Sequence, residues 1–187
     1  MKKVLVAYSA NYVAAREFII GVFKFINEGH DWNVHMLGNP YEITPETVRN
    51  AIRDGTDGIL TGFNMVTPGY KELIKANIPL VLNNFPSQLP PPDIPNISVL
   101  HNDEIAIGRK AASFLRMKGN FRTFAYVPDK TKSWWSTYRQ RGFRIELAKH
   151  SIPCKTFRGN RSQLETWLKA LVKPAAILAT NDVTGTR

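Results

Sequence analysis

The polar and aromatic residues that could do chemistry gather just after short apolar runs of the sequence. The residues of this kind are Asn11, Tyr12, Asn64, Asn83, Asn84, Phe85, Trp134, Trp135, Arg139, Asn181 and Asp182. Asn, Arg and Asp supply hydrogen-bond donors and acceptors in fixed pairs, and an aromatic ring covers the C–H face of a sugar. This set predicts the binding of a neutral polyhydroxylated ligand. The alternative is that the Asn and Asp residues cap helices and that the tryptophans fill the core.

Signatures of catalysis are missing from the sequence. It contains no G-x-x-x-x-G-K-[ST], no G-x-G-x-x-G after the first apolar run, no G-x-S-x-G and no H-E-x-x-H. The four histidines lie far apart, and the single cysteine, Cys154, stands in an apolar run beside Pro153. We therefore predict no catalytic residues, no cofactor and no metal. A small α/β enzyme acting on a nucleotide or sugar phosphate is the alternative, and it would need a phosphate cradle or an acid–base pair.

Composition is that of a globular protein. The chain has 187 residues, of which 43% are hydrophobic and 21% charged, so it can bury a sizeable core. One cysteine cannot form an internal disulfide, which is typical of a reducing compartment. No apolar run approaches the ~20 residues of a membrane helix, and no cleavage site follows Lys2-Lys3. We expect a cytoplasmic protein without a membrane partner.

The net charge of +10 is concentrated in the second half of the chain. Residues 109–161 hold 14 Lys and Arg against Asp129 and Glu146. Such a field could attract nucleic acid or another polyanion. A solvated basic face is the alternative, because no compact series of basic and aromatic residues is visible.

Strand-like runs alternate with helical patterns in the first half. Apolar residues three and four positions apart predict a helix over 13–27 with one buried face, formed by Ala15, Ile19, Val22, Phe23 and Ile26. The further expected elements are strands at 4–8, 32–37, 58–61 and 78–82 and helices that start at 44 and span 68–76. This order predicts a parallel sheet with right-handed crossovers.

The alternation resumes after a proline-rich stretch. Pro90-Pro91-Pro92 excludes a helix or a central strand from 86–95, which we expect to be an ordered surface loop. Beyond it we expect strands at 97–100, 121–127, 153–157 and 175–179, and helices at 102–118, 136–149 and 162–172. The result is an α/β protein of two units, 1–100 and 101–187. Residues 181–187 have the pattern of a cap and a first helical turn, so we expect a parent protein to continue beyond Arg187.

Three segments resemble the sensor domain of LacI/GalR-type regulators. Residues 99–103 with Gly108-Arg109-Lys110-Ala111-Ala112 are similar to its crossover strand and helix. Residues 136–143 resemble its Arg-x-x-Gly-Phe helix start, and residues 176–182 resemble its strand ending in Asn-Asp. The resemblance spans essentially the whole chain. It implies the periplasmic-binding-protein-like type I fold, with two parallel-sheet lobes, a ligand cleft between them and a second lobe that is incomplete here.

The resemblance also implies a ligand-binding set. Arg139 corresponds to the arginine that reaches ligand hydroxyls, and Asn181 to an asparagine of the cleft. The full expected set is Asn11, Tyr12, Arg16, Asn83, Trp135, Arg139, Asn181 and Asp182. The implied ligand is a small sugar or related metabolite.

One departure from the LacI pattern affects the expected function. The first strand begins within the first few residues, without the helix-turn-helix that precedes it in LacI-type repressors. Residues 4–15 and 134–143 look closer to the xylose-operon regulators, which carry an AraC-type pair of helix-turn-helix motifs after the sensor. The resemblance therefore implies a homodimeric transcription regulator in which a sugar such as a pentose controls DNA binding through a domain absent from this chain. Phe18, Ile20 and Phe25 would suit the dimer contact, or they fill a wide helix footprint on the sheet. A solute-binding protein of a sugar transporter is the alternative.

Overall fold

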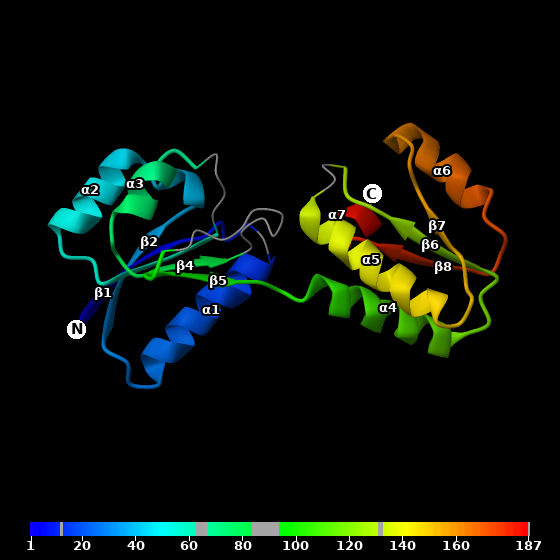
Figure 1. Ribbon diagram of the computed structural model, residues 1–187, viewed down its shortest axis with the longest axis horizontal. Coiled ribbons are helices and arrows are strands. Elements are labelled where there is room, and N and C mark those ends of the chain that lie inside the picture. The colour runs from blue at the N-terminus through cyan, green and yellow to red at the C-terminus, as the bar shows by residue number, and fades with distance from the viewer. Residues whose placement is uncertain (12, 63–66, 84–93, 131–132, 187) are drawn as a thin grey trace. The chain divides into compact units, whose positions relative to one another are not determined.

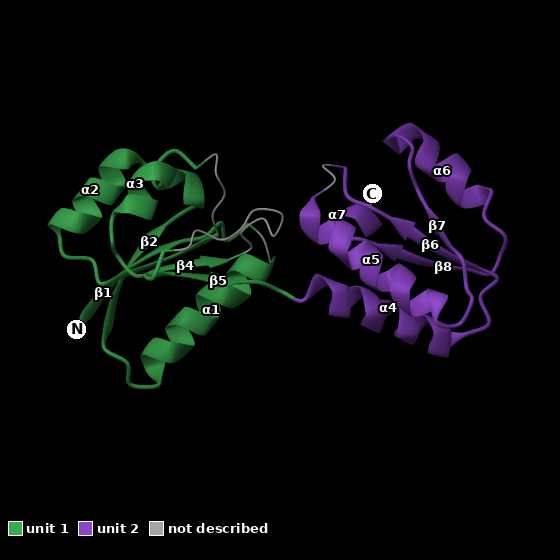
Figure 2. Cartoon of the chain, in the orientation of Figure 1, with its two compact units in different colours: residues 1–102 green, residues 103–187 purple. Residues whose placement is uncertain are grey.

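The computed structural model describes residues 1–11, 13–62, 67–83, 94–130 and 133–186. The chain divides into two compact units, residues 1–102 and 103–187 (Figures 1 and 2). Every strand pairing within the two sheets is parallel. The predicted α/β class with parallel sheets is therefore confirmed.

The first unit is a five-stranded sheet with the strand order β2-β1-β3-β4-β5. Its strands are β1 (Lys2–Ala7), β2 (Trp32–Leu37), β3 (Gly58–Gly62), β4 (Leu80–Asn83) and β5 (Ile97–Leu100). Its helices are α1 (Val13–Asn27), the short 3-10 helix η1 (Pro40–Glu42), α2 (Pro45–Arg53) and α3 (Tyr70–Lys75). Most of the expected proline-rich loop, and the Pro90-Pro91-Pro92 run itself, lies outside the described residues.

The central strand β1 is buried on both faces. Val4 and Val6 pack with Val22 of α1 on one side of the sheet. Leu5 and Ala7 belong to a separate apolar cluster on the other side, where α2 and α3 lie (Figure 1). A strand covered by helices on both faces needs an uninterrupted apolar run, and the sequence supplies one.

The buried face of α1 differs from the expected one. Phe23 is 46% exposed, so its assignment to the buried face is wrong. Phe18 instead packs on the ring of Tyr8, with ring centroids 4.5 Å apart, and Phe25 stacks on His30 at 3.6 Å. The physical reason is that the wide sheet surface accepts side chains on both flanks of the helical stripe. Phe18 therefore packs on the unit's own core, Phe25 packs on His30 and Trp32, and Ile20 is exposed.

Tyr8, one residue beyond β1, carries a polar atom that the fold leaves unsatisfied. Its hydroxyl is buried without a hydrogen-bond partner among the described residues, and an unmade hydrogen bond of this kind costs about 1–3 kcal/mol. We expect Tyr8→Phe to raise the free energy of unfolding by about 1 kcal/mol at neutral pH, because the penalty disappears and the ring stays. Urea unfolding followed by circular dichroism measures this change.

The same variant should change the response to alkaline pH. Burial raises the pKa of Tyr8. Above about pH 10 the unfolded chain loses phenol protons that the folded chain keeps, so the free energy of unfolding of the wild type should fall as the pH rises. Tyr8→Phe should show a shallower fall between about pH 9 and pH 11. An equally steep fall in both proteins would contradict this assignment.

The second unit is a three-stranded sheet with the strand order β7-β6-β8. Its elements are α4 (Glu104–Lys118), β6 (Thr123–Val127), α5 (Trp134–Ala148), β7 (Cys154–Thr156), α6 (Arg161–Lys169), β8 (Ala175–Ala179) and α7 (Asp182–Gly185). Helices α4 and α5 cover one face of the sheet, where Ala112 and Phe143 pack on Phe124 and Tyr126. Helix α6 lies on the other face (Figure 1).

Two glycines set the contact between α4 and α5. A Cβ atom on Gly108 would overlap the carbonyl oxygen of Arg139 and lie 2.7 Å from the backbone nitrogen of Phe143. A Cβ on Gly142 would overlap the carbonyl oxygen of Ile105. The two helix backbones therefore touch directly. This contact brings the start of α4 next to the middle of α5, where Arg139 stands.

Helix α5 begins earlier than the sequence predicted. Trp134 and Trp135 lie in its first turn and not in a loop before it. The Trp134 ring meets Tyr138 edge to face, with centroids 6.1 Å apart. Such i, i+4 aromatic pairs stabilise a helix, which explains the two extra residues. Among the described residues, no helix is long and apolar enough to cross a membrane.

Candidate functional site

A pocket of about 510 Å³ lies in the second unit beside the carboxyl end of β8. Its lining comes from α4, α5, β8 and α7, and consists of Ile107, Arg139, Leu178, Ala179, Thr180, Asn181, Asp182, Gly185 and Thr186. Three residues of the expected ligand-binding set are thus brought together: Arg139, Asn181 and Asp182. Ligands of open α/β sheets bind at this edge, where helix N-termini and loops converge.

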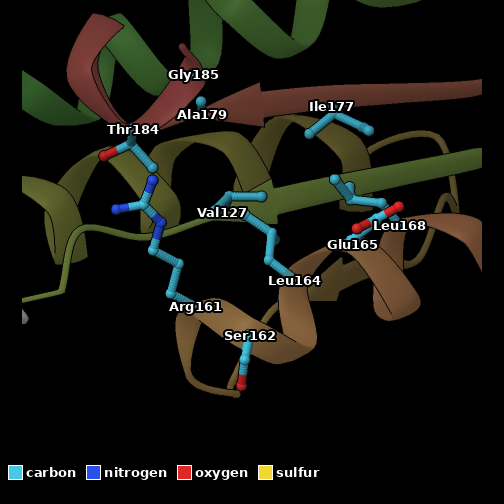
Figure 3. A pocket seen from close by; sticks show the side chains of 10 residues that line it. All are labelled: Val127, Arg161, Ser162, Leu164, Glu165, Leu168, Ile177, Ala179, Thr184 and Gly185. Carbon is cyan, nitrogen blue, oxygen red and sulfur yellow. The ribbon is translucent and has the colours of Figure 1, made fainter. Parts of the chain in front are cut away.

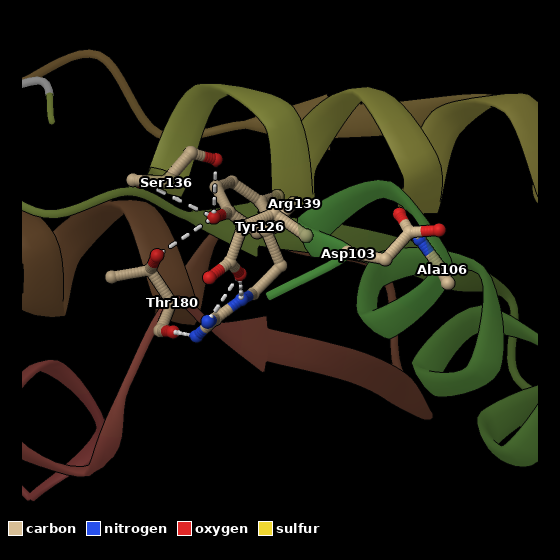
Figure 4. Close-up of polar contacts among 7 residues, drawn as sticks. Asp103, Ala106, Tyr126, Ser136, Arg139 and Thr180 are labelled. Atoms are coloured by element: carbon tan, nitrogen blue, oxygen red, sulfur yellow. Dashed lines mark hydrogen bonds and ion pairs between the residues drawn. The ribbon is translucent and has the colours of Figure 1, made fainter. Parts of the chain in front are cut away.

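Arg139 is held firmly at the pocket wall. Its Nε and Nη2 donate to Oε2 of Glu104 at 2.8 Å and 2.5 Å, and its Nη1 donates to the carbonyl oxygen of Thr180 (Figure 4). The guanidinium carbon lies 5.4 Å from the ring centre of Trp135. A guanidinium has five N–H donors. The remaining two have no acceptor among the described residues and are available to a ligand.

Glu104 is a buried acid in the first turn of α4. Its side chain is 4% exposed and that of Arg139 is 18% exposed. The helix begins there because Asp103 caps it, accepting a hydrogen bond from the backbone nitrogen of Ala106 at 2.8 Å. A carboxylate near a helix N-terminus is stabilised by the helix dipole, and here it also neutralises the arginine.

A buried polar network lies next to the ion pair of Arg139 and Glu104. The Tyr126 hydroxyl lies 2.8 Å from Oγ1 of Thr180 and 2.9 Å from the carbonyl oxygen of Ser136 (Figure 4). All three residues are almost fully buried, and burial raises the pKa of Tyr126. Because the network joins β6, the start of α5 and the end of β8, it fixes the backbone that carries Arg139 and Asn181.

Asn181 has the capping role that the sequence offered as one alternative. Its side-chain oxygen caps α7, accepting from the backbone nitrogen of Thr184 at 2.8 Å. Its amide nitrogen, which carries two N–H donors, has no hydrogen-bond partner within the described part of the chain, so both donors are left for a ligand. Asp182 follows as the first, exposed residue of α7. Cap and ligand contact are therefore compatible at Asn181.

The expected residues of the first unit do not line a described pocket. Asn11 is exposed in the turn after β1, and Asn83 is half-buried at the end of β4. Arg16 donates from Nη1 to the carbonyl oxygen of Ala10 at 2.9 Å and so closes the β1–α1 turn. Tyr12 lies outside the described residues, as do Asn64, Asn84 and Phe85. The two units are described separately, so the expected cleft between two lobes stays a prediction.

A larger hollow of about 970 Å³ lies under α6, between the helix and the sheet (Figure 3). Its walls are mainly apolar, with Val127, Ile177 and Ala179 from the sheet facing Leu164 and Leu168 of α6. It contains none of the expected ligand-binding residues. We assign the site to the smaller pocket because only that one has fixed polar groups converging on it.

The sequence did not reveal the residues that support Arg139. Glu104, Tyr126 and Thr180 were not in the expected set, because each looks ordinary within its own element. The usable signal was the spacing of two mid-helix glycines: Glu104 stands four residues before Gly108, and Arg139 three before Gly142. Glycines inside two helices indicate a close helix contact, and residues one turn away on each helix must then meet.

Neither metal ligation nor thiol chemistry is indicated by the described residues. Within them, no group of three or more His, Cys, Asp or Glu side chains could hold a metal ion. Cys154 is half-buried in β7, and burial raises the pKa of its thiol. A raised pKa disfavours the reactive thiolate.

Comparison with known proteins places the fold. Neither a protein-family model nor a curated protein matches the sequence, but solved structures match its coordinates. A putative LacI-family transcriptional regulator from Rhizobium etli matches with a TM-score of 0.71 and 17% identity, over 98% of this chain and 69% of that one. The fold is that of LacI-type sensors and periplasmic binding proteins.

Two further LacI-type and periplasmic structures carry sugars. A periplasmic binding protein/LacI transcriptional regulator from Alkaliphilus metalliredigens QYMF, complexed with D-xylulofuranose, matches with a TM-score of 0.59 and 13% identity, over 99% of this chain and 69% of that one. The periplasmic component of the arabinose ABC transporter from Shewanella sp. ANA-3, bound to L-arabinofuranose, matches with a TM-score of 0.63 and 20% identity, over 97% of this chain and 65% of that one. This chain thus spans about two thirds of the length of these structures. The predicted LacI-type fold is confirmed.

Proposed function

We propose that this chain is the ligand-sensing part of a transcription regulator and binds a small sugar, such as a pentose. The observation that carries the proposal is the pocket at the end of β8. There Arg139, fixed by Glu104, offers two N–H donors beside the amide of Asn181 and the carboxylate of Asp182. Adjacent hydroxyls of a sugar both donate and accept hydrogen bonds, so this mixed set suits them.

The expected mechanism is a shift of populations without covalent chemistry. A sugar changes the balance between two arrangements of a protein only by its difference in affinity for them, typically a coupling of about 1–3 kcal/mol. Arg139 and Asn181 would supply part of that difference. The ligands in two similar structures, D-xylulofuranose and L-arabinofuranose, are five-carbon sugars and support this ligand class.

The finer proposal is a cytoplasmic homodimer with an AraC-type DNA-binding domain outside this chain, as in xylose-operon regulators. Of the three α1 residues expected at a dimer contact, Ile20 is exposed. The second candidate function is a solute-binding protein of a sugar transporter, favoured by the similarity to the arabinose transporter component. Two successive helix-turn-helix patterns after Arg187 in the parent gene would support the regulator, and an export signal upstream would support the transporter.

Arg139→Ala tests the ligand assignment. We expect it to weaken sugar binding by about 1–3 kcal/mol, because charge-assisted hydrogen bonds to the ligand are lost. Isothermal titration calorimetry against a panel of pentoses and hexoses measures the affinity. Absence of any sugar binding by the wild type would contradict the proposed function, and unchanged affinity of the variant would remove Arg139 from the site.

Asn181→Ser is a second test of the ligand site, which applies even if the arginine variant does not fold. Serine is as good a helix cap as asparagine, so α7 should persist while the amide donor is lost. We expect this variant to keep the wild-type circular dichroism spectrum and unfolding midpoint and to bind the same sugar about tenfold more weakly, the loss of about one hydrogen bond.

A further inference from the structure

The two units differ sharply in charge. The second unit has 17 Lys and Arg against six Asp and Glu, a formal charge of +11, while the first has eight against nine, a charge of −1. The excess is therefore a property of one unit. A difference of this size within one chain creates a positive field that favours a polyanionic partner.

Apart from Arg139, the Arg and Lys side chains of α4 and α5 are exposed, or half-buried in the case of Arg116. The buried sides of the two helices pack on the sheet through Ala112, Leu115, Phe143 and Leu147. We define the basic face as Arg109, Lys110, Arg116, Arg141 and Lys149, all exposed except the half-buried Arg116. Helices α4 and α5 touch at their glycines, and Arg109 of α4 lies close enough to Glu146 of α5 to help lower its pKa.

Few of these charges are neutralised. Glu146 pairs with Lys149 at 2.7 Å. The pKa of Glu146 is lowered by Lys149 first, and also by His150 and Arg109, so one carboxylate faces three basic side chains. Arg109, Lys110, Arg116 and Arg141 make no ion pair with any described residue. The face thus keeps an uncompensated positive charge.

The dimensions and chemistry of the basic face fit a phosphate backbone. Each helix has 15 residues, a length of about 22 Å, along which duplex DNA presents roughly a dozen phosphates. Three of the five side chains are arginines, whose planar fork matches a phosphate group. An acidic protein segment would offer carboxylates, but rarely at such a regular and dense spacing.

We infer that the basic face of α4 and α5 binds the backbone of duplex DNA without reading its sequence. The contact would add to whatever separate domain recognises an operator, and it does not depend on the proposed sugar ligand. It would hold the sensing unit against DNA and make the binding of the parent protein more dependent on salt.

The test is the affinity of the 187-residue chain for a fluorescein-labelled duplex of about 20 bp and mixed sequence, measured by anisotropy between about 50 and 200 mM salt. The face variant is Lys110→Glu with Arg141→Glu, and the matched control is Lys71→Glu with Arg49→Glu in the first unit. All four side chains are exposed and make no ion pair with a described residue, and each double variant changes the net charge equally.

We expect the wild type to bind, and the face variant to bind at least tenfold more weakly. We also expect its slope of log affinity against log salt to be smaller by about two, one unit for each lost phosphate contact. The control should stay within about threefold of the wild type. No binding at low salt, or equal losses in both variants, would overturn the inference. Displacement of the labelled duplex by poly-L-glutamate at an equal concentration of charges would also overturn the inference, in favour of an acidic protein partner.

Discussion

Gly108→Ala is expected to lower the free energy of unfolding of the second unit by about 3 kcal/mol, at the upper end of the usual cost of overpacking. The added methyl group would meet the backbone of α5 at Arg139 and Phe143. A flexible side chain could move away, but a helix backbone can yield only if the whole helix shifts. Three of the four tryptophans, Trp134, Trp135 and Trp167, belong to this unit, so urea unfolding followed by tryptophan fluorescence measures the loss.

Gly21→Ala in α1 is the matched control. Gly21 is also a mid-helix glycine, but a Cβ atom there would have no heavy atom within 4 Å. The substitution should therefore show only the better helix propensity of alanine, a gain of about 0.5–1 kcal/mol. If both variants changed stability in the same direction and by the same amount, the glycine contact would not be the element that holds α4 to α5.

Glu104→Gln is expected to cost about 3 kcal/mol, because removing one partner of a buried ion pair leaves the other charge uncompensated. Glutamine has the same shape, so the loss reports the charge and not a cavity. Arg139 is only 18% exposed and cannot recover full hydration. The free energy of unfolding from urea titrations at neutral pH gives the value.

A double-mutant cycle separates this charge effect from general damage. Arg139→Met removes the cation and keeps much of the apolar stem. We expect Glu104→Gln with Arg139→Met to lose about 2 kcal/mol less than the sum of the two single losses, because the double variant buries no lone charge. Strict additivity would show that the two side chains do not act as a pair.

Local patterns were enough to predict the sheet-and-helix order. The helix over 13–27 and the strands at 32–37, 97–100 and 175–179 coincide with α1, β2, β5 and β8. Each is specified within its own stretch by apolar periodicity and end signals. The start of α5 was missed, since an aromatic pair overrode the expected serine start.

The candidate site could be predicted only in part. Arg139, Asn181 and Asp182 follow motifs that are readable in sequence, and the structure brings them to one pocket. Glu104 could not be found in this way, because its role depends on its contact with Arg139, which stands 35 positions later on another helix. The misplacement of Phe23 has the same origin, since the width of the sheet under α1 is a tertiary property.

The glycine contact also limits how the second unit can move. Helices that meet through interdigitating side chains can shift to a second packing arrangement. Helix backbones in direct contact at glycines have no such second arrangement. We therefore expect helices α4 and α5 to move together as one rigid body. If a ligand binds Arg139 as proposed and shifts α5, it would carry along the neighbouring Arg141 and also α4, because the two helices move together.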